Sequence, residues 1–276
     1  MSSSSGSFIS PGGMPARYGE IMREKMGTST KRLLARAVMA GVVIALTCVG
    51  ATALYALLPY AVARVAAAAM FPAGLAMVLI MGGELFTGNS LLTLGLLTGD
   101  VRPRGLLRNW GVVYLGNFIG SLLVASLVAV AYRADAAFLA ALRTAAETRA
   151  ALTWLEAFVR AILCNVLVCA AVWMAYTSST VPGKLMALYA PVMLFVLAGM
   201  EHCVTNMYYF MAPLLAGAQG DITWATFLLG NLLPVTLGNI VGGAVVCAGM
   251  LWLSLFEGRG DATFFLEKKK EAKKNH

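Results

Sequence analysis

Long apolar stretches separated by short polar segments make up most of the chain. Six of them are long enough to cross a membrane as a helix, which needs ~20 largely apolar residues. They cover residues 37–58, 65–98, 110–131, 157–177, 185–217 and 234–256. The second and fifth are too long for one ordinary crossing, which is typical of helices broken midway. The pattern predicts an all-α membrane protein with six transmembrane helices, of which helices two and five are broken.

The two longest stretches share an unusual interruption by one acidic residue among small residues. Residues 82–90 read GGELFTGNS, and residues 199–206 read GMEHCVTN. A carboxylate or an open helix backbone at bilayer depth is unfavourable unless it lines a cavity inside the protein. Two such interruptions, in corresponding halves of the chain, indicate a permeation path through a channel or transporter.

The two halves of the chain look duplicated. Three motifs recur in the same order, at similar offsets of 124, 117 and 122 residues. Three spans per repeat is an odd number, so the repeats must have inverted topology, with the translocation site near the midplane at their interface. The matching positions are Arg36 with Arg160, Glu84 with Glu201, and Leu115-Gly116-Asn117 with Leu237-Gly238-Asn239.

Composition agrees with this class of protein. Hydrophobic residues make up 59% of the 276 residues and charged residues only 12%, against about 25% charged in soluble domains. Residues 1–13 lead into polar residues rather than an apolar core, so we expect no cleavable signal peptide. We expect a cytoplasmic segment over 1–30 with a disordered start, a channel domain over 31–256 and a basic cytoplasmic tail over 257–276.

The distribution of Lys and Arg predicts the orientation. Sixteen lie on the side of the two termini and five on the other. By the positive-inside rule, we expect both termini to be cytoplasmic. We expect the protein to lie in the plasma or inner membrane. We expect the tail lysines to face lipid headgroups or water, and no nucleic-acid partner. The five on the other side are Arg64, Arg133, Arg143, Arg149 and Arg160.

These motifs resemble the formate/nitrite transporter family, over about residues 37–256. The resemblance implies a homopentamer of aquaporin-like six-helix protomers with one pore in each. It implies conduction of small monovalent anions or their acids: formate, nitrite, hydrosulfide and, in some eukaryotic members, lactate. The segments that carry it are Phe71-Pro72, 82–89, Ala161-Ile162-Leu163-Cys164-Asn165, Val168-Cys169, 199–206 and Pro234-Val235-Thr236-Leu237-Gly238-Asn239.

The resemblance also implies roles for single residues. His202 would be the central pore histidine, with Thr87 and Asn239 as its polar partners. Phe71 and Phe195 would form one apolar constriction, and Leu75, Leu85 and Phe86 the other. Arg149 stands near the family's vestibule lysine, in the poorly matched segment 132–156, and Asn165 is assigned to the same vestibule. The residues expected to support the helix breaks are Glu84, Asn89, Glu201 and Asn206.

Histidine suits the centre of a pore for weak acids. His202 is the only histidine within a span, and an unperturbed imidazole titrates near physiological pH. A desolvated anion is costly in hydrocarbon, whereas its protonated acid crosses far more easily. We therefore predict proton-linked passage; whether His202 exchanges a proton or only donates a hydrogen bond stays open.

Two other classes of function were compared with this prediction. An aquaporin-type channel for neutral solutes predicts paired Asn-Pro-Ala motifs at the helix breaks, and the sequence has none. An intramembrane enzyme using Glu201 and His202 would need a nucleophile–base pair or a metal set. The cysteines lack the spacing of metal ligands, and we expect them to be buried as small hydrophobic residues. We expect neither enzyme activity nor a cofactor; the choice among the anions stays open.

Overall fold

The computed structural model describes residues 8–218 and 220–256. The disordered start and the basic tail 257–276 predicted above lie outside the described residues. Five helices in the described part are long and apolar enough to cross a membrane: α2 (Thr30–Leu57), the run 60–80, α7 (Pro103–Ala131), α9 (Trp154–Tyr176) and the run 226–256. Two shorter apolar helices cover Phe86–Leu97 and Val181–Leu197. The protein is all-helical apart from one isolated bridge in this part.

The second apolar stretch is divided into several helices. It contains α3 (Tyr60–Met70), α4 (Pro72–Ile80), α5 (Phe86–Asn89), η2 (Ser90–Thr93) and α6 (Leu94–Leu97). The fifth stretch contains α10 (Val181–Leu197) and α11 (Cys203–Leu215). Residues 81–85 and 198–202 are therefore non-helical, at the two positions where the sequence has its acidic interruptions.

The first half-helix of each pair ends in the same way. Gly82 has φ +73° and Gly199 has φ +68°, a left-handed conformation that glycine adopts without strain. The next amide in each case reaches back, from Gly83 to the Val78 carbonyl at 2.8 Å and from Met200 to Phe195 at 3.0 Å. This is the Schellman arrangement, which satisfies carbonyls that a helix end would leave unpaired. The glycines therefore set where α4 and α10 stop.

The last crossing begins at Thr226 rather than near 234 as predicted. It consists of η3 (Thr226–Leu232), α12 (Leu233–Ile240), η4 (Val241–Cys247), α13 (Ala248–Leu251) and η5 (Trp252–Phe256). Gly230 and Asn231 lower the hydropathy of its first turns, but Phe227 and Asn231 are buried. Burial against neighbouring helices thus extends a helix that hydropathy alone cuts short.

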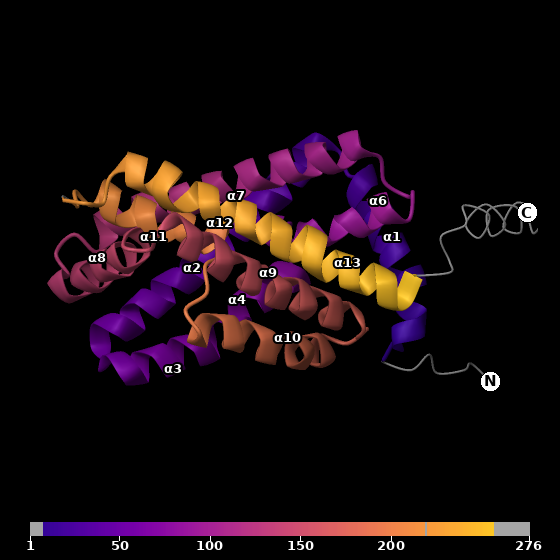
Figure 1. The fold of residues 1–276 in the computed structure, drawn as a ribbon. Coiled ribbons are helices and arrows are strands. Elements are labelled where there is room, and N and C mark those ends of the chain that lie inside the picture. Colours follow the sequence, from indigo (N-terminus) through magenta and orange to yellow (C-terminus); the bar gives the residue numbers. More distant parts are fainter. Residues whose placement is uncertain (1–7, 219, 257–276) are drawn as a thin grey trace, which may run out of the picture.

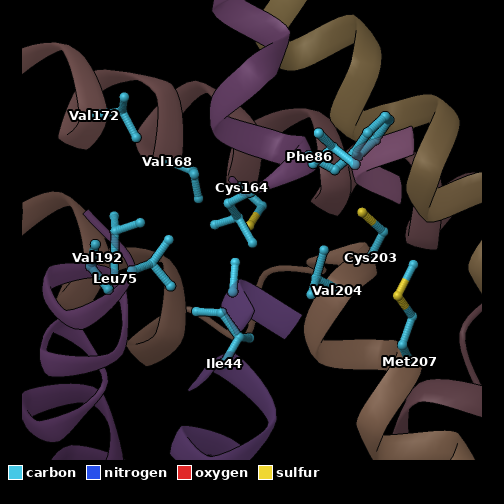
Figure 2. Packing of buried hydrophobic residues seen from close by; sticks show 14 of the residues in the cluster. Ile44, Leu75, Phe86, Cys164, Val168, Val172, Val192, Cys203, Val204 and Met207 are labelled. Carbon is cyan, nitrogen blue, oxygen red and sulfur yellow. The ribbon is translucent and has the colours of Figure 1, made fainter. Parts of the chain in front are cut away.

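Close contacts between small residues hold the bundle together. A side-chain carbon on Gly120 of α7 would collide with the Val38 carbonyl of α2, and one on Gly242 of η4 with the Ile162 carbonyl of α9. Small residues let membrane helices approach to backbone contact. Between the halves, small and medium apolar side chains fill the centre, among them Cys164, Val168 and Val172 of α9 (Figure 2).

Two helices that hydropathy did not predict lie at opposite ends of the bundle (Figure 1). The helix α1 (Met14–Gly27), preceded by η1 (Pro11–Gly13), lies at the end where α6 and α13 finish. The helix α8 (Ala136–Ala150) lies at the other end, within the segment 132–156. Each brings one cation to a helix break.

Candidate functional site

His202 and Thr87 meet where the two second half-helices begin. The Nε2 atom of His202 lies 2.9 Å from the Thr87 hydroxyl oxygen, and Nδ1 accepts a hydrogen bond from the Thr205 amide at 3.3 Å. Because Nδ1 is the acceptor, a neutral ring carries its proton on Nε2 and donates it to Thr87. His202 is the N-cap of α11, and both side chains are buried. The structure thus brings together these two predicted residues of the pore centre.

Asn239 does not contact this pair; its side chain binds backbone groups at the second helix break. Its Nδ2 atom donates to the carbonyls of Ala161 (2.8 Å) and Glu201 (3.0 Å), and its Oδ1 atom accepts from the Cys203 amide at 2.9 Å. Its amide is therefore fully engaged by backbone groups. Asn239 fixes the start of α11, and so the position of His202, rather than contacting the pore centre.

Asn117 plays the same part at the first break. Its Nδ2 atom donates to the carbonyls of Ala37 (2.8 Å) and Glu84 (2.9 Å), and its Oδ1 atom accepts from the Phe86 amide at 2.9 Å. These partners correspond one for one to those of Asn239. The duplication seen in the sequence thus extends to individual hydrogen bonds.

Glu84 lies in a buried polar cluster at the first break. Asn89 donates from Nδ2 to Glu84 Oε2 at 2.8 Å and to Asn109 Oδ1 at 2.9 Å. Lys25 of α1 reaches the same cluster, with Nζ 2.6 Å from Glu84 Oε2 and 3.0 Å from Asn89 Oδ1. A buried carboxylate requires such a cation and hydrogen bonds. The cluster therefore ties α1 to the helix break.

The second break has a matching polar cluster in which the cation has a different hydrogen-bond partner. Asn206 donates from Nδ2 to Glu201 Oε2 at 2.6 Å and to Asn231 Oδ1 at 2.7 Å. Arg149 of α8 donates from Nε to Asn206 Oδ1 at 3.1 Å, and its guanidinium lies 4.0 Å from the centre of the Tyr209 ring. The cation thus binds the amide here, whereas Lys25 binds the carboxylate directly.

Three residues of these clusters were missed from the sequence. Asn109 and Asn231 are 122 residues apart, the offset that separates the Leu-Gly-Asn motifs, so the repeat itself was the signal that could have found them. Lys25 had no such signal, because it belongs to α1, outside the six apolar stretches.

A cavity of about 630 Å³ lies between α8 and the second helix break. Arg64, Arg149 and Arg160 line it, and so do Phe71 and Phe195. The two phenylalanine rings contact edge-on with centroids 6.1 Å apart. Phe195 in turn stacks on the His202 ring at 6.0 Å. The order from outside is therefore basic cavity, aromatic contact, histidine.

The other residues expected at a constriction come from α4 and from the start of α5. Leu75, Leu85 and Phe86 are all buried, but Leu75 and Phe86 lie on opposite sides of Cys164 (Figure 2). Phe86 contacts Tyr114 of α7 edge-on, with centroids 4.9 Å apart. This contact places the Phe86 ring against α7.

Asn165 is not in the cavity with Arg149, contrary to the predicted vestibule. It is fully buried, and its Nδ2 atom donates to the Asn239 carbonyl at 2.6 Å and to the Ser90 hydroxyl at 3.2 Å. Asn165 sits four positions after Ala161 on α9, on the face that packs against the run 226–256. It therefore links that helix to η2.

Comparison with known proteins places this arrangement among membrane transporters. A family model described as formate/nitrite transporter matches residues 15–253. The chain is 40% identical over 212 residues to a probable formate transporter of Methanothermobacter thermautotrophicus, covering 70% of this chain and 76% of that protein. It is 39% identical over 212 residues to the formate channel FocA of Haemophilus influenzae, covering 70% and 74%.

Solved structures agree with the sequence comparison. A structure described as a pentameric formate channel with formate bound matches with a TM-score of 0.70 and 32% identity, over 81% of this chain and 96% of that one. A structure described as an FNT family ion channel matches with a TM-score of 0.78 and 29% identity, over 87% and 96%.

Proposed function

Because the chain belongs to the formate/nitrite transporter family, an integral membrane family of anion channels and transporters, we propose that it conducts formate in a proton-linked manner. The observation that carries the proposal is the order of basic cavity, Phe71–Phe195 contact and Thr87–His202 pair. Nitrite, hydrosulfide and lactate are the other anions to be compared with formate. An aquaporin-type channel for neutral solutes is the alternative, and an arginine-lined cavity disfavours it.

In the proposed architecture, six segments cross the membrane as an inverted repeat of three plus three in an aquaporin-like protomer. The crossings two and five are the broken segments 60–97 and 181–215. The mirrored hydrogen bonds of Asn117 and Asn239 support this repeat. The similar structure described as pentameric supports a homopentamer with one pore in each protomer.

The proposed orientation places α1 and the end of the run 226–256 on the cytoplasmic side. Both lie at the same end of the bundle (Figure 1), and most Lys and Arg residues flank that end. The proposed cytoplasmic segment 1–30, channel domain 31–256 and basic tail 257–276 follow from this orientation. The cavity then opens to the opposite side.

Each part of the path has a physical role in this proposal. The arginines raise the anion concentration in the cavity, because a basic cleft concentrates counter-ions. The phenylalanine contact strips water, which favours the neutral acid over its anion. At the centre, the N-terminal ends of Phe86–Leu97 and α11 favour negative charge. The proton on His202 Nε2 and the Thr87 hydroxyl then offer a hydrogen bond to the passing carboxyl group.

Formate uptake into proteoliposomes as a function of external pH tests this function. At fixed formate concentration and fixed ion gradients, we expect uptake to rise as external pH falls, because more of the substrate is the acid that crosses the aromatic contact. Uptake independent of pH would rule out proton-linked passage in favour of plain anion conduction. Vesicle swelling in glycerol without formate uptake would favour the neutral-solute channel.

A further inference from the structure

The arginines of the cavity differ in how fully their donors are used. Arg149 donates from Nε to Asn206 and from a terminal nitrogen to the Ala145 carbonyl at 2.7 Å, and it lies over Tyr209. It is thus a fixed charge whose guanidinium is largely engaged. Arg64 and Arg160 line the same cavity but belong to α3 and α9, away from the polar cluster of Asn206.

Arg64 is oriented by one hydrogen bond that leaves most of its donors unused. Its Nε atom donates to the Leu197 carbonyl at 2.9 Å. That carbonyl belongs to the last residue of α10, where helix carbonyls lose their intrahelical partners. The two terminal nitrogens of Arg64 make no further hydrogen bond in the described part of the chain. They form a donor fork at the wall of the cavity.

Arg160 forms no salt bridge among the described residues, in contrast to its counterpart in the first repeat. Arg36 lies 3.9 Å from Glu24 of α1, whereas Arg160 makes no ion pair or hydrogen bond through its side chain among residues 8–218 and 220–256. Glu156, one turn earlier on the same helix, is engaged by the Thr153 amide and hydroxyl at 2.8 and 2.7 Å. Glu156 attracts Arg160 electrostatically, but no hydrogen bond engages the Arg160 guanidinium in the described part of the chain, so its donors are available to an anion.

The remaining lining suits an organic anion that is larger than formate. Tyr55, Tyr60 and Tyr209 supply aromatic faces, and Glu201 is the one acidic residue among the described lining side chains, buried and bonded to Asn206. A volume of about 630 Å³ lies within the range of sites for small organic ligands. Phe71 and Phe195 are in edge-on contact with ring centroids 6.1 Å apart, so we expect a rigid ring not to pass between them.

We propose that this cavity is a binding site for aromatic monocarboxylates, which Arg64 and Arg160 hold by the carboxylate and which block the path without passing through it. Guanidinium forks match a carboxylate in a bidentate manner and also stack on aromatic faces. The blocking effect rests on the proposed formate conduction; binding at the cavity does not.

Calorimetric titration of the purified full-length protein in detergent with benzoate tests the binding. We expect binding to the wild type, and an affinity reduced about tenfold or more in Arg64→Gln/Arg160→Gln, because hydrogen bonds to charged groups are lost. Arg160→Gln alone should weaken binding about fivefold, and it removes no side-chain hydrogen bond among the residues that the structure describes. Arg133→Gln, a matched change outside the cavity lining, should bind as the wild type does.

Several outcomes would overturn the proposal. The proposal is wrong if the wild type does not bind benzoate, or if the double variant binds benzoate with the wild-type affinity. It is also wrong if benzyl alcohol binds as tightly as benzoate, or if inorganic phosphate displaces benzoate as well as a carboxylate does. In proteoliposomes, benzoate should inhibit formate uptake, with an inhibitory concentration raised about tenfold in the double variant. If the wild type takes up no formate, the proposed function fails, while calorimetry still decides the binding site.

Discussion

Replacing His202 by Phe and by Asn separates the transport role of this side chain from its structural role. His202 makes two hydrogen bonds, one to the Thr205 amide as N-cap of α11 and one to the Thr87 hydroxyl. A side-chain N-cap stabilises a protein by about 0.5–2 kcal/mol, and a typical hydrogen bond by about 0.5–1.5 kcal/mol. Phe keeps a planar ring but makes neither bond.

The expected loss of unfolding free energy follows from these contacts. His202→Phe should destabilise each protomer by about 1–3.5 kcal/mol, since both bonds disappear. His202→Asn should lose only about 0.5–1.5 kcal/mol, because Asn is a good N-cap but too short to reach Thr87. Thermal unfolding of the detergent-purified variants measures this difference, and Asn is the control for folding.

Transport should follow a different order from stability. We expect His202→Phe to abolish proton-linked formate uptake or to convert it to uncoupled conduction, because the buried donor and the titratable group are both gone. His202→Asn should transport but lose much of its pH dependence. Both are measured as formate uptake in proteoliposomes across external pH. If folded His202→Phe protein transports at the wild-type rate with the wild-type pH profile, His202 is a structural residue and the mechanism is wrong.

Two further predictions concern the helix breaks. Asn239→Leu leaves the buried Glu201 carbonyl and Cys203 amide without partners, at about 1–3 kcal/mol each, and removes a second hydrogen bond from the Ala161 carbonyl. We therefore expect the folded protein to be lost in size-exclusion chromatography; a wild-type elution profile would contradict this. Lys25→Met leaves Glu84 buried without its cation, which should destabilise by about 3–5 kcal/mol. Lys25→Met/Glu84→Gln should recover part of that loss in thermal unfolding, and equal midpoints for Lys25→Met and the wild type would refute the pairing.

The helix breaks could be predicted from the sequence because polar residues at membrane depth are conspicuous. The non-helical residues 81–85 and 198–202 overlap the first parts of the acidic interruptions 82–90 and 199–206, and the later parts begin the next helices. The family predicted from the motifs is confirmed by the family model over 15–253. Glu84 and Glu201 stand out because a carboxylate is rare in an apolar stretch. The His202–Thr87 proximity followed from the family resemblance.

The sequence predicted poorly what depends on long-range packing. Lys25 meets Glu84 only because α1 folds back against the bundle, and a short polar helix has no hydropathy signal. Asn165 was assigned to a vestibule, but its helix face turns it toward Ser90 and the run 226–256. The hydrogen bonds of Asn239 to backbone groups could not be predicted either, since an amide side chain in a membrane span can face a pore or a backbone carbonyl equally well.

The cavity at the α8 end also shapes the electric field along the path. A solvent-accessible space that reaches in to Phe71 and Phe195 conducts, so little of the transmembrane voltage falls across it. The voltage drop is concentrated between this contact and the α1 end, where a unit charge crossing 100 mV changes energy by about 2.3 kcal/mol. In the proposed path, an anion docks among the arginines almost without electrical work. In that path the anion meets the field at His202, so the half of the protein toward α1 would be the voltage-sensitive half.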